Sequence, residues 1–430
     1  MRWKAFFYLN PDAGGQQKQT YGFNSRKTPP QIQEMTKFEN RLINMIENVK
    51  TRNINCHFQK QLSSDIKTKI KNCNDLLIPA DKTTNFYKMK TDTYNELLHK
   101  NITKTYKQTS QKTTNEIEAE AKTIAENLLL DDRINVTAKR EAFITMKDHK
   151  PNFKNNPTCR LINPAKSEIG KISKQILDRI NKKIVEHRDL NQWKNTSAVL
   201  NWFNNINCKD KHTFIIFDII DFYPSITIEL LNAALDFASR YDDITDDEKH
   251  IIIQAKKSCL YNSDKPWGKK TSSNLFDVTM GSFDGAETCE LVGSFLLHRI
   301  EEKHGNGFGL YRDDGLGITK ASPRQAERMK KDLCTIFENH GLRITIEANK
   351  KIVDYLDVTL DLNSGKYGPY TKPNNTPLYV HSRSNHPPNI IKNIPEAINK
   401  RLTEISYDEE TFQKAIPIYQ DALDRSGYKH

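Results

Sequence analysis

The chain has 430 residues, and its 65 lysines and arginines outnumber its 54 aspartates and glutamates to give a formal net charge of +11. This length suits two or three packed subdomains, and the basic balance favours a polyanionic partner, although general solubility explains the charge equally well. The seven cysteines form no Cys-x-x-Cys pair, which excludes a zinc-finger spacing and indicates reduced thiols in an intracellular protein. No apolar run has the length of a signal peptide or a membrane span, so neither secretion nor membrane insertion is predicted.

The front of the chain is polar and carries no recognisable chemistry. We expect an N-terminal extension over 1–74 with one helix at about 32–49. An acid-rich helix is predicted at about 115–130, because alanines and leucines recur there at helical spacing. Short apolar pairs alternate with lysines and Arg160 over 142–164, which predicts a basic β-ribbon.

The middle of the chain predicts helices around a few isolated strands. A helix over 168–187 follows from isoleucines at three- and four-residue steps. Strands and helices do not alternate regularly and no glycine-rich phosphate loop follows a strand, so a doubly wound sheet is excluded and an α+β palm with helical subdomains is expected. Further helices are predicted at about 197–206, 228–241, 246–260, 285–303 and 323–340, with strands within 342–362.

Adjacent carboxylates at Asp313 and Asp314 lie between two short apolar runs. This pattern predicts a hairpin that presents both acids at its turn. A second apolar run, over 214–224, predicts a buried strand that carries Asp218. Three acids on neighbouring strands would ligate two Mg²⁺ ions, because Mg²⁺ takes hard oxygen ligands. Two metals roughly 4 Å apart are typical of phosphoryl transfer, and nucleotide polymerisation fits this arrangement best.

Other aspartate pairs weaken the signal from Asp313 and Asp314 alone. The pairs at 131–132, 242–243 and 246–247 lie in polar surroundings. Acids at a helix start are favoured by the positive end of the helix dipole, so we interpret these pairs as solvated caps. Among the four pairs, Asp313 and Asp314 are the two with strand-like flanks on both sides.

The ordered motifs of the chain resemble those of reverse transcriptases. The variant Tyr-Arg-Asp-Asp, together with the stretch at 81–85 (Asp-Lys-Thr-Thr-Asn), resembles the Penelope-like retroelement polymerases in particular, and the likeness covers roughly residues 75–405. The motifs are, in chain order, Phe217-Asp218-x-x-Asp221-Phe222-Tyr223-Pro224-Ser225-Ile226, Met280-Gly281-Ser282, Tyr311-Arg312-Asp313-Asp314, Gly341-Leu342 and Tyr355-Leu356-Asp357-Val358.

The resemblance implies a right-hand polymerase with fingers, a palm of antiparallel sheet backed by helices, and a partial helical thumb. The fingers and N-terminal polymerase region would occupy 75–210, the palm 211–370 with a finger insertion at about 228–275, and the thumb or connector 371–430. It also implies an RNA-directed DNA polymerase of a retroelement, with an RNA template, a DNA primer and dNTPs as partners. Nuclear residence follows from the family alone.

The resemblance assigns the metal site and the sugar gate. Asp218, Asp313 and Asp314 would bind two Mg²⁺ ions, with Mn²⁺ as a substitute. Tyr223 would be the steric gate that clashes with a 2′-hydroxyl and so selects deoxynucleotides. The alternative for Tyr223 is an ordinary core aromatic beside Phe222.

Basic finger residues would bind the triphosphate of the incoming nucleotide. Lys150 and Arg160 take this role in the resemblance, and the fork of a guanidinium suits phosphate geometry. Lys147 and Lys154 compete for the lysine role. Any one of these cations is also compatible with a solvated surface charge.

Two further roles follow from the motifs. Gly281 would let the backbone approach the nucleotide or template at a helix entrance. Lys351, or its neighbour Lys350, would protonate the pyrophosphate. The chain departs from the common pattern after Gly281, so Asp284 and Glu287 are expected to do no more than cap the helix.

Three other functions compete with this assignment. A B-family DNA polymerase shares the Tyr-Pro-Ser-Ile run at 223–226 but separates its two acids by a threonine. Viral RNA-dependent RNA polymerases use adjacent aspartates but a smaller or acidic residue where Tyr223 stands. A catalytically inactive or domesticated nucleic-acid-binding protein is the third alternative, and the intact triad argues against it. No GIY-YIG endonuclease motif follows the polymerase motifs, so we expect no self-made target nick.

Overall fold

The computed structural model describes residues 1–11, 21–23, 28–50, 57–71, 75–83, 85–134, 139–148, 150, 153, 155–164, 166–271, 275–372 and 377–429. Within these residues, no helix combines the length and the apolar character needed to cross a membrane.

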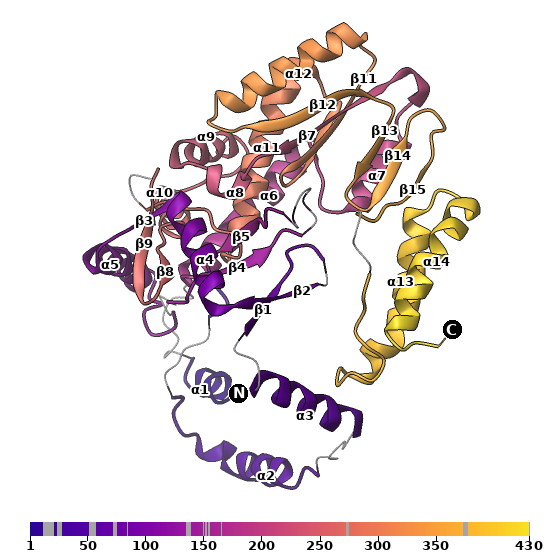
Figure 1. Ribbon diagram of the computed structural model, residues 1–430. Coiled ribbons are helices and arrows are strands. Elements are labelled where there is room, and N and C mark those ends of the chain that lie inside the picture. The colour runs from indigo at the N-terminus through magenta and orange to yellow at the C-terminus, as the bar shows by residue number, and fades with distance from the viewer. Residues whose placement is uncertain are drawn as a thin grey trace.

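The centre of the molecule is a five-stranded sheet in the order β12-β7-β11-β10-β6 (Figure 1). Its neighbouring strands are antiparallel except β6 and β10, which are parallel. The expected antiparallel palm sheet is therefore confirmed, with one short parallel strand at its edge. The strands are β6 (Asn191–Gln192), β7 (Thr213–Ile219), β10 (Phe308–Tyr311), β11 (Asp314–Thr319) and β12 (Ile344–Lys350).

One face of the sheet is covered by helices that form the main core. Phe217 and Ile219 of β7 point to this face and belong to the same cluster of buried side chains as the helices. Figure 1 shows α12 on the outer side of the sheet, next to β12. The helices are α6 (Ile169–His187), α9 (Ile228–Ala238), α10 (Asp246–Gln254), α11 (Gly285–His304) and α12 (Pro323–Glu338), and the short α8 (Phe222–Ser225) follows β7.

The opposite face of the sheet is covered over only part of its length. Successive strand residues face opposite sides, so Phe214 and Ile216 point away from the main core. They pack in a second core with α7 and the sheet β13-β14-β15. Asp218 shares their face but lies beyond this core, where its side chain is exposed. The elements are α7 (Thr196–Asn204), η3 (Lys209–Lys211), β13 (Ile352–Tyr355), β14 (Val358–Asp361) and β15 (Tyr367–Pro369).

Three small sheets lie within the ranges expected for the fingers and the finger insertion. One is the hairpin β1-β2, another is the ribbon β4-β5, which confirms the predicted ribbon, and in the third β3 pairs with β9, which pairs with β8. The segment expected as a finger insertion thus pairs with the fingers through β3. The elements are β1 (Asp75–Pro79), β2 (Phe86–Lys90), α4 (Thr91–Thr105), β3 (Tyr106–Gln108), α5 (Gln111–Asn127), β4 (Phe143–Met146), β5 (Cys159–Ile162), β8 (Leu260–Asn262) and β9 (Lys265–Lys269).

The helix expected over 246–260 is too long. It ends at Gln254, and Leu260 begins the hairpin β8-β9. The turn of this hairpin is Ser263 and Asp264, both with positive φ of 53° and 59°. Two such residues make the tight turn that matches strand twist, and it is usually built with glycine or asparagine.

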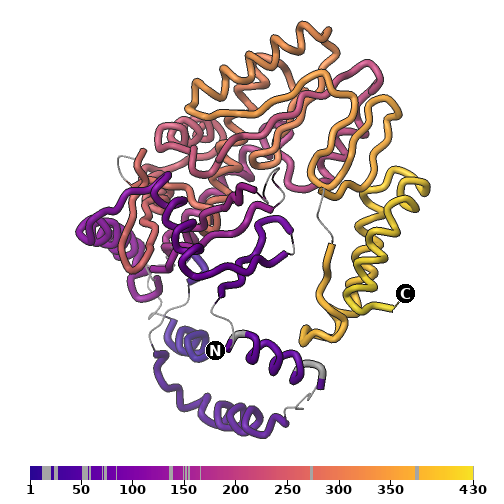
Figure 2. Tube along the Cα trace, viewed as in Figure 1, coloured from indigo at the N-terminus to yellow at the C-terminus, as the bar shows by residue number. Residues whose placement is uncertain are grey.

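The ends of the chain are helical. Figure 2 shows α1 (Arg2–Leu9), α2 (Thr36–Glu47), preceded by the short η2 (Gln33–Met35), and α3 (His57–Lys71) apart from the central sheet. At the other end, α13 (Pro388–Ile405) and α14 (Glu409–Arg425) pack against each other. Arg401 of α13 lies 2.6 Å from Asp357 of the β13-β14 turn, which fastens this helix to the second core.

Candidate active site

Three aspartates meet where β7 lies beside the β10-β11 hairpin. Asp314 is the direct partner of Asp218 in the β11-β7 ladder, and Asp313 lies in the two-residue turn between Tyr311 and Asp314. The N–H of Ile219 donates to the Asp313 carbonyl at 2.9 Å. The hydroxyl of Tyr355 donates to the Asp314 carbonyl at 2.6 Å. The structure therefore brings together the three predicted carboxylates.

Gly315 of this hairpin leaves room for the ring of Phe217 to pack tightly against the strand. A Cβ on Gly315 would lie 2.1 Å from Cζ of Phe217, so only a residue without a side chain leaves room for that ring. The ring lies on the helix-covered face of the sheet, and Asp218, the next residue, points to the other face. The packing of Phe217 thus fixes the side on which Asp218 emerges.

Burial and the charge of Asp313 raise the pKa of two carboxyls, those of Asp218 and Asp314. Burial, followed by the charges of Asp313 and Asp218, raises the pKa of Asp314 to about 6, although Lys372 and Lys82 act in the opposite direction. Partial burial and the charge of Asp313 also raise the pKa of Asp218, against the effect of Lys150 and Lys82. Bringing in a cation would relieve this repulsion.

The donor set of the three aspartates fits Mg²⁺. Carboxylate oxygens are the ligands that Mg²⁺ prefers, and substrate phosphates and water usually complete its shell. Within the described part of the chain, no group of three His, Cys, Asp or Glu side chains is placed so that it could hold a metal ion. The fit to Mg²⁺ therefore concerns the type of donor atom and not a complete set of ligands.

Tyr223, in α8, lies near the aspartates and next to the start of α11. A Cβ on Gly285 would lie 3.3 Å from Cε1 of Tyr223, so the ring packs against the first residue of that helix. Burial is the main cause that raises the pKa of Tyr223, and the charge of Asp313 adds to it. Its neighbour Phe222 is only 2% exposed and fills the main core. The core position thus belongs to Phe222, and Tyr223 is half-buried.

The β4-β5 ribbon brings cations to the site. Arg160 of β5 lies 3.3 Å from Asp81, and its Nη1 is 3.5 Å from the sulfur of Met280. Lys150 lies near enough to Asp218 for its charge to lower the pKa of that carboxyl. Burial and Arg160 lower the pKa of Lys147. Lys154 lies outside the described residues.

Gly281 occupies a backbone conformation that favours glycine. Its φ is +92°, and a Cβ there would meet no described atom within 4 Å. The requirement at this position is therefore conformational, and the space before the backbone is open.

Asp284, at the start of α11, was expected to cap this helix. Its side chain does not do so, because the carboxylate pairs with the buried Lys256. Glu287 pairs with Lys174.

The structure does not bring Lys351 to the aspartates. Its Nζ donates to the carbonyls of Asp210 at 2.6 Å and His212 at 2.7 Å, just before β7 begins. Asp218 lies near the other end of that strand. Lys350 is likewise opposite Phe214 in the ladder. The role expected for Lys351 is therefore wrong on position, because β12 runs antiparallel to β7 and carries both lysines away from the site.

Two other lysines, Lys82 and Lys372, lie near the aspartates. Both lower the pKa of Asp314. Burial and Lys82 lower the pKa of Lys372, whereas Asp314 raises it. Lys82 belongs to the stretch at 81–85 that carried part of the family resemblance, but no local pattern marks Lys372.

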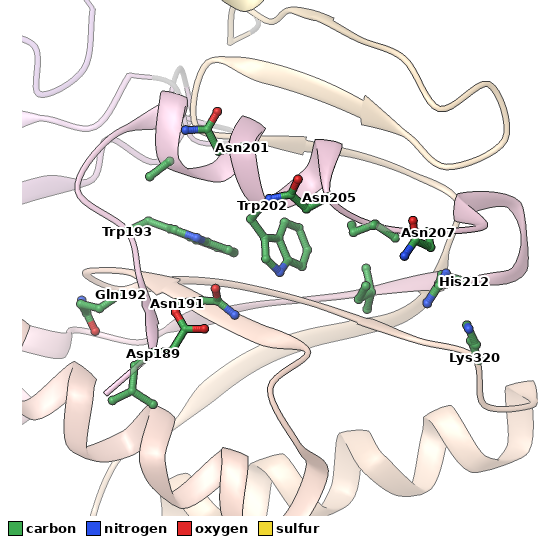
Figure 3. A pocket seen from close by; sticks show the side chains of 14 residues that line it. Asp189, Asn191, Gln192, Trp193, Asn201, Trp202, Asn205, Asn207, His212 and Lys320 are labelled. Carbon is green, nitrogen blue, oxygen red and sulfur yellow. The ribbon is translucent and has the colours of Figure 1, made fainter. Parts of the chain in front are cut away.

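A separate hollow of about 640 Å³ lies between β6 and α7 (Figure 3). The rings of Trp193 and Trp202 lie in it with their centroids 5.1 Å apart. None of the site residues described above lines this hollow.

The fold is similar to those of telomerases and viral RNA polymerases. An apo telomerase from Candida tropicalis aligns with a TM-score of 0.50 at 9% identity, over 81% of this chain and 64% of that chain. A telomerase from Candida albicans in complex with a TWJ fragment of telomeric RNA gives 0.48 at 11%, over 69% and 52%. An insertion-loop deletion mutant of the RNA-dependent RNA polymerase of a human picobirnavirus gives 0.45 at 10%, over 91% and 87%.

The alignment with the Candida tropicalis telomerase shows that the chain has a right-hand polymerase fold. The chain spans about half to two thirds of the telomerase chains that it matches. Residues 378–430, which contain α13 and α14, match a family model described as an animal helix-turn-helix domain. No curated protein matches the chain.

Proposed function

We propose that this chain, whose fold is that of right-hand polymerases, is an RNA-directed DNA polymerase of a Penelope-like retroelement. The observation that carries the proposal is the register of β7 and β11, which sets Asp218 opposite Asp314 with Asp313 in the adjoining turn. The salt bridge between Arg160 and Asp81 joins the family-specific stretch at 81–85 to the finger ribbon, which supports the narrower assignment.

The three aspartates would hold two Mg²⁺ ions, or Mn²⁺ in their place. When bound, such ions activate an attacking hydroxyl and neutralise charge on a leaving pyrophosphate. The protein's contribution is to hold Asp218 and Asp314 in adjacent strands, so the carboxylates are positioned before substrate arrives. Their raised pKa values show that this arrangement disfavours three free negative charges.

Cations opposite the aspartates would bind the triphosphate of the incoming nucleotide, and one of them would protonate the leaving pyrophosphate. Arg160 offers a planar fork to phosphate oxygens, and Lys150 adds charge beside Asp218. Lys372 takes the place proposed from sequence for Lys351. Its Nζ lies near Asp314 and has a lowered pKa, which suits transfer of a proton to the leaving pyrophosphate.

Tyr223 would select the sugar of the incoming nucleotide. Its ring packs against the start of α11, which limits how far it can move away from a nucleotide. A 2′-hydroxyl would clash with a ring held there, so deoxynucleotides would be favoured. The net charge of +11 suits an RNA template and a DNA primer, and the same family resemblance favours residence in the nucleus.

The test is incorporation of labelled dTTP on poly(rA) primed with oligo(dT), with Mg²⁺, Mn²⁺ or EDTA. We expect metal-dependent incorporation by the wild type and its loss in Asp313→Asn. Asp243→Asn is the matched control, because Asp243, like Asp313, belongs to an adjacent aspartate pair but lies exposed after α9.

Each outcome separates the proposal from its alternatives. Normal incorporation by Asp313→Asn would contradict the metal assignment. A wild type that folds and binds RNA in a salt-dependent way but incorporates nothing would favour the non-catalytic nucleic-acid-binding alternative. Incorporation that is lost equally in Asp243→Asn would show a general effect of charge rather than a role of the triad.

A further inference from the structure

A buried lysine from the finger insertion contacts the turn that carries Tyr223. Lys269, the last residue of β9, is 7% exposed. Its Nζ donates a hydrogen bond of 2.5 Å to the carbonyl of Pro224, the residue that follows Tyr223 in α8. The proposed gate is therefore attached to a different subdomain, 45 positions further along the chain.

Two other buried groups hold Lys269 in place. Its Nζ lies 3.3 Å from Oδ1 of Asp277, and the hydroxyl of Tyr106 donates to Oδ2 of the same carboxylate at 2.6 Å. All three side chains are at least nine-tenths buried. Charges are tolerated at such depth when they are paired and hydrogen-bonded, so the network fixes the position of the ammonium group.

The carboxylate partner of Lys269 is itself part of a fixed segment. The N–H of Asp277 donates to the carbonyl of Lys256 at 2.9 Å, and the side chain of Lys256 pairs with the fully buried Asp284. Gly281 lies between these two aspartates. The segment that carries Gly281 and the turn that carries Tyr223 are thus joined through one ammonium group.

Packing alone leaves the turn room to move on one side. A hollow of about 330 Å³ borders it and is lined by Pro224, Ser225, Lys269 and Arg343, among others. Hydrogen bonds from a charged donor are stronger than neutral ones, and a low local dielectric strengthens them further. The bond from Lys269 to Pro224 therefore restrains the turn in this direction, in addition to the bond that the Ser225 hydroxyl donates to the Ile220 carbonyl at 3.3 Å.

We propose that Lys269 is a positioning residue for Tyr223 and, through it, a determinant of sugar selection. The role in sugar selection rests on the proposed function. The restraint that Lys269 places on the turn does not depend on that function. Two measurements test the two parts separately.

The main variant is Lys269→Met with Asp277→Asn. The double change removes the ammonium group and neutralises its partner, so no unpaired charge is left buried, and the hydroxyl of Tyr106 retains an acceptor. Hydrogen exchange, followed by mass spectrometry, measures the restraint on the turn. We expect faster exchange at the amides of Ser225 and Ile226, which bond to Asp221 and Phe222 across the turn.

The second measurement is kcat/KM for dTTP relative to UTP on poly(rA) primed with oligo(dT). Loss of a single hydrogen bond predicts a fall in discrimination of about 3- to 10-fold, with a higher KM for dTTP and an unchanged KM for primer–template. Tyr106→Phe is the matched control, because it removes a hydrogen bond from the same buried network but keeps the contact of Lys269 with Pro224.

The outcomes distinguish this inference from the proposed function. Unchanged exchange in a folded double variant would overturn the restraint. Faster exchange with unchanged discrimination, or an equal loss of discrimination in Tyr106→Phe, would overturn the role in sugar selection. A wild type that incorporates neither nucleotide would contradict the proposed function, and exchange would still decide whether Lys269 fixes the turn.

Discussion

Asp314 is the residue at which electrostatics oppose folding most clearly in the candidate site. Its pKa rises from an ordinary value of 3.8 to about 6 in the folded chain. A carboxyl with a raised pKa binds protons more tightly in the folded state than in the unfolded state. The stability of the metal-free protein therefore falls as pH rises from about 4 to about 6, and the loss remains at higher pH.

Replacing Asp314 by asparagine should stabilise the metal-free protein. We expect Asp314→Asn to increase the free energy of unfolding at pH 7.5 by on the order of 2 kcal/mol, and the gain to vanish near pH 4. Urea unfolding in EDTA at both pH values measures this difference. Mg²⁺ should narrow the gap by stabilising the wild type alone. A variant less stable than the wild type at pH 7.5 would contradict the electrostatic argument.

The β10-β11 hairpin depends on close packing between Gly315 of β11 and the ring of Phe217 of β7. Gly315→Ala should place a methyl group where the ring of Phe217 lies, at 2.1 Å from its nearest atom. We expect a loss of about 1–3 kcal/mol in the free energy of unfolding, measured in urea, because overpacking displaces side chains or backbone. Gly368→Ala in β15 is the control, since its Cβ would meet its nearest neighbour at an ordinary 3.7 Å. Equal losses in both variants would contradict the packing argument.

Elements with a strong period are predictable from this sequence. The isoleucine pattern predicts α6 to within one residue of its start, and apolar flanks predict the hairpin that carries Asp313 and Asp314. The hairpin β8-β9 is missed because its turn uses serine and aspartate in a left-handed conformation instead of glycine. β6 has only two residues, so it leaves no pattern at all.

Residues that reach the site from distant elements are not predictable in the same way. The three aspartates follow from strand ends, which local sequence marks. Lys351 was placed by its motif, but the direction of β12 takes it to the far end of β7. Lys372 approaches Asp314 from the segment after β15, and only the tertiary arrangement determines that approach.

The charge of the whole molecule is unevenly distributed along the chain. Residues 378–430 contain seven lysines and arginines and seven aspartates and glutamates, so the surplus of +11 lies in the first 377 residues. If the proposed function holds, electrostatic attraction to a nucleic-acid backbone should therefore act mainly through residues 1–377. Residues 378–430, whose charges balance, should add little to it.

Binding of primer–template by the whole chain should depend steeply on salt. Basic side chains release counterions from phosphates, so the logarithm of the affinity should fall linearly with the logarithm of the salt concentration. With 6–10 phosphate contacts, the loss between 50 and 200 mM salt would be about 10³- to 10⁵-fold. Fluorescence anisotropy of a labelled duplex measures it, and Asp313→Asn should give the same slope. An affinity independent of salt would contradict the charge argument.

The pairing of β7 with β11 also bears on how this part of the chain can diverge. The turn between β10 and β11 spans two residues, and the ladder continues without a bulge from Asp314 to Thr319. Inserting or deleting one residue in β11 would turn its later side chains to the opposite face. Either Leu316 would leave the second core or, if the later residues kept their register, Asp314 would lose its position opposite Asp218. We infer that natural relatives vary here by substitution, and that changes in length are confined to the connections outside the paired strands.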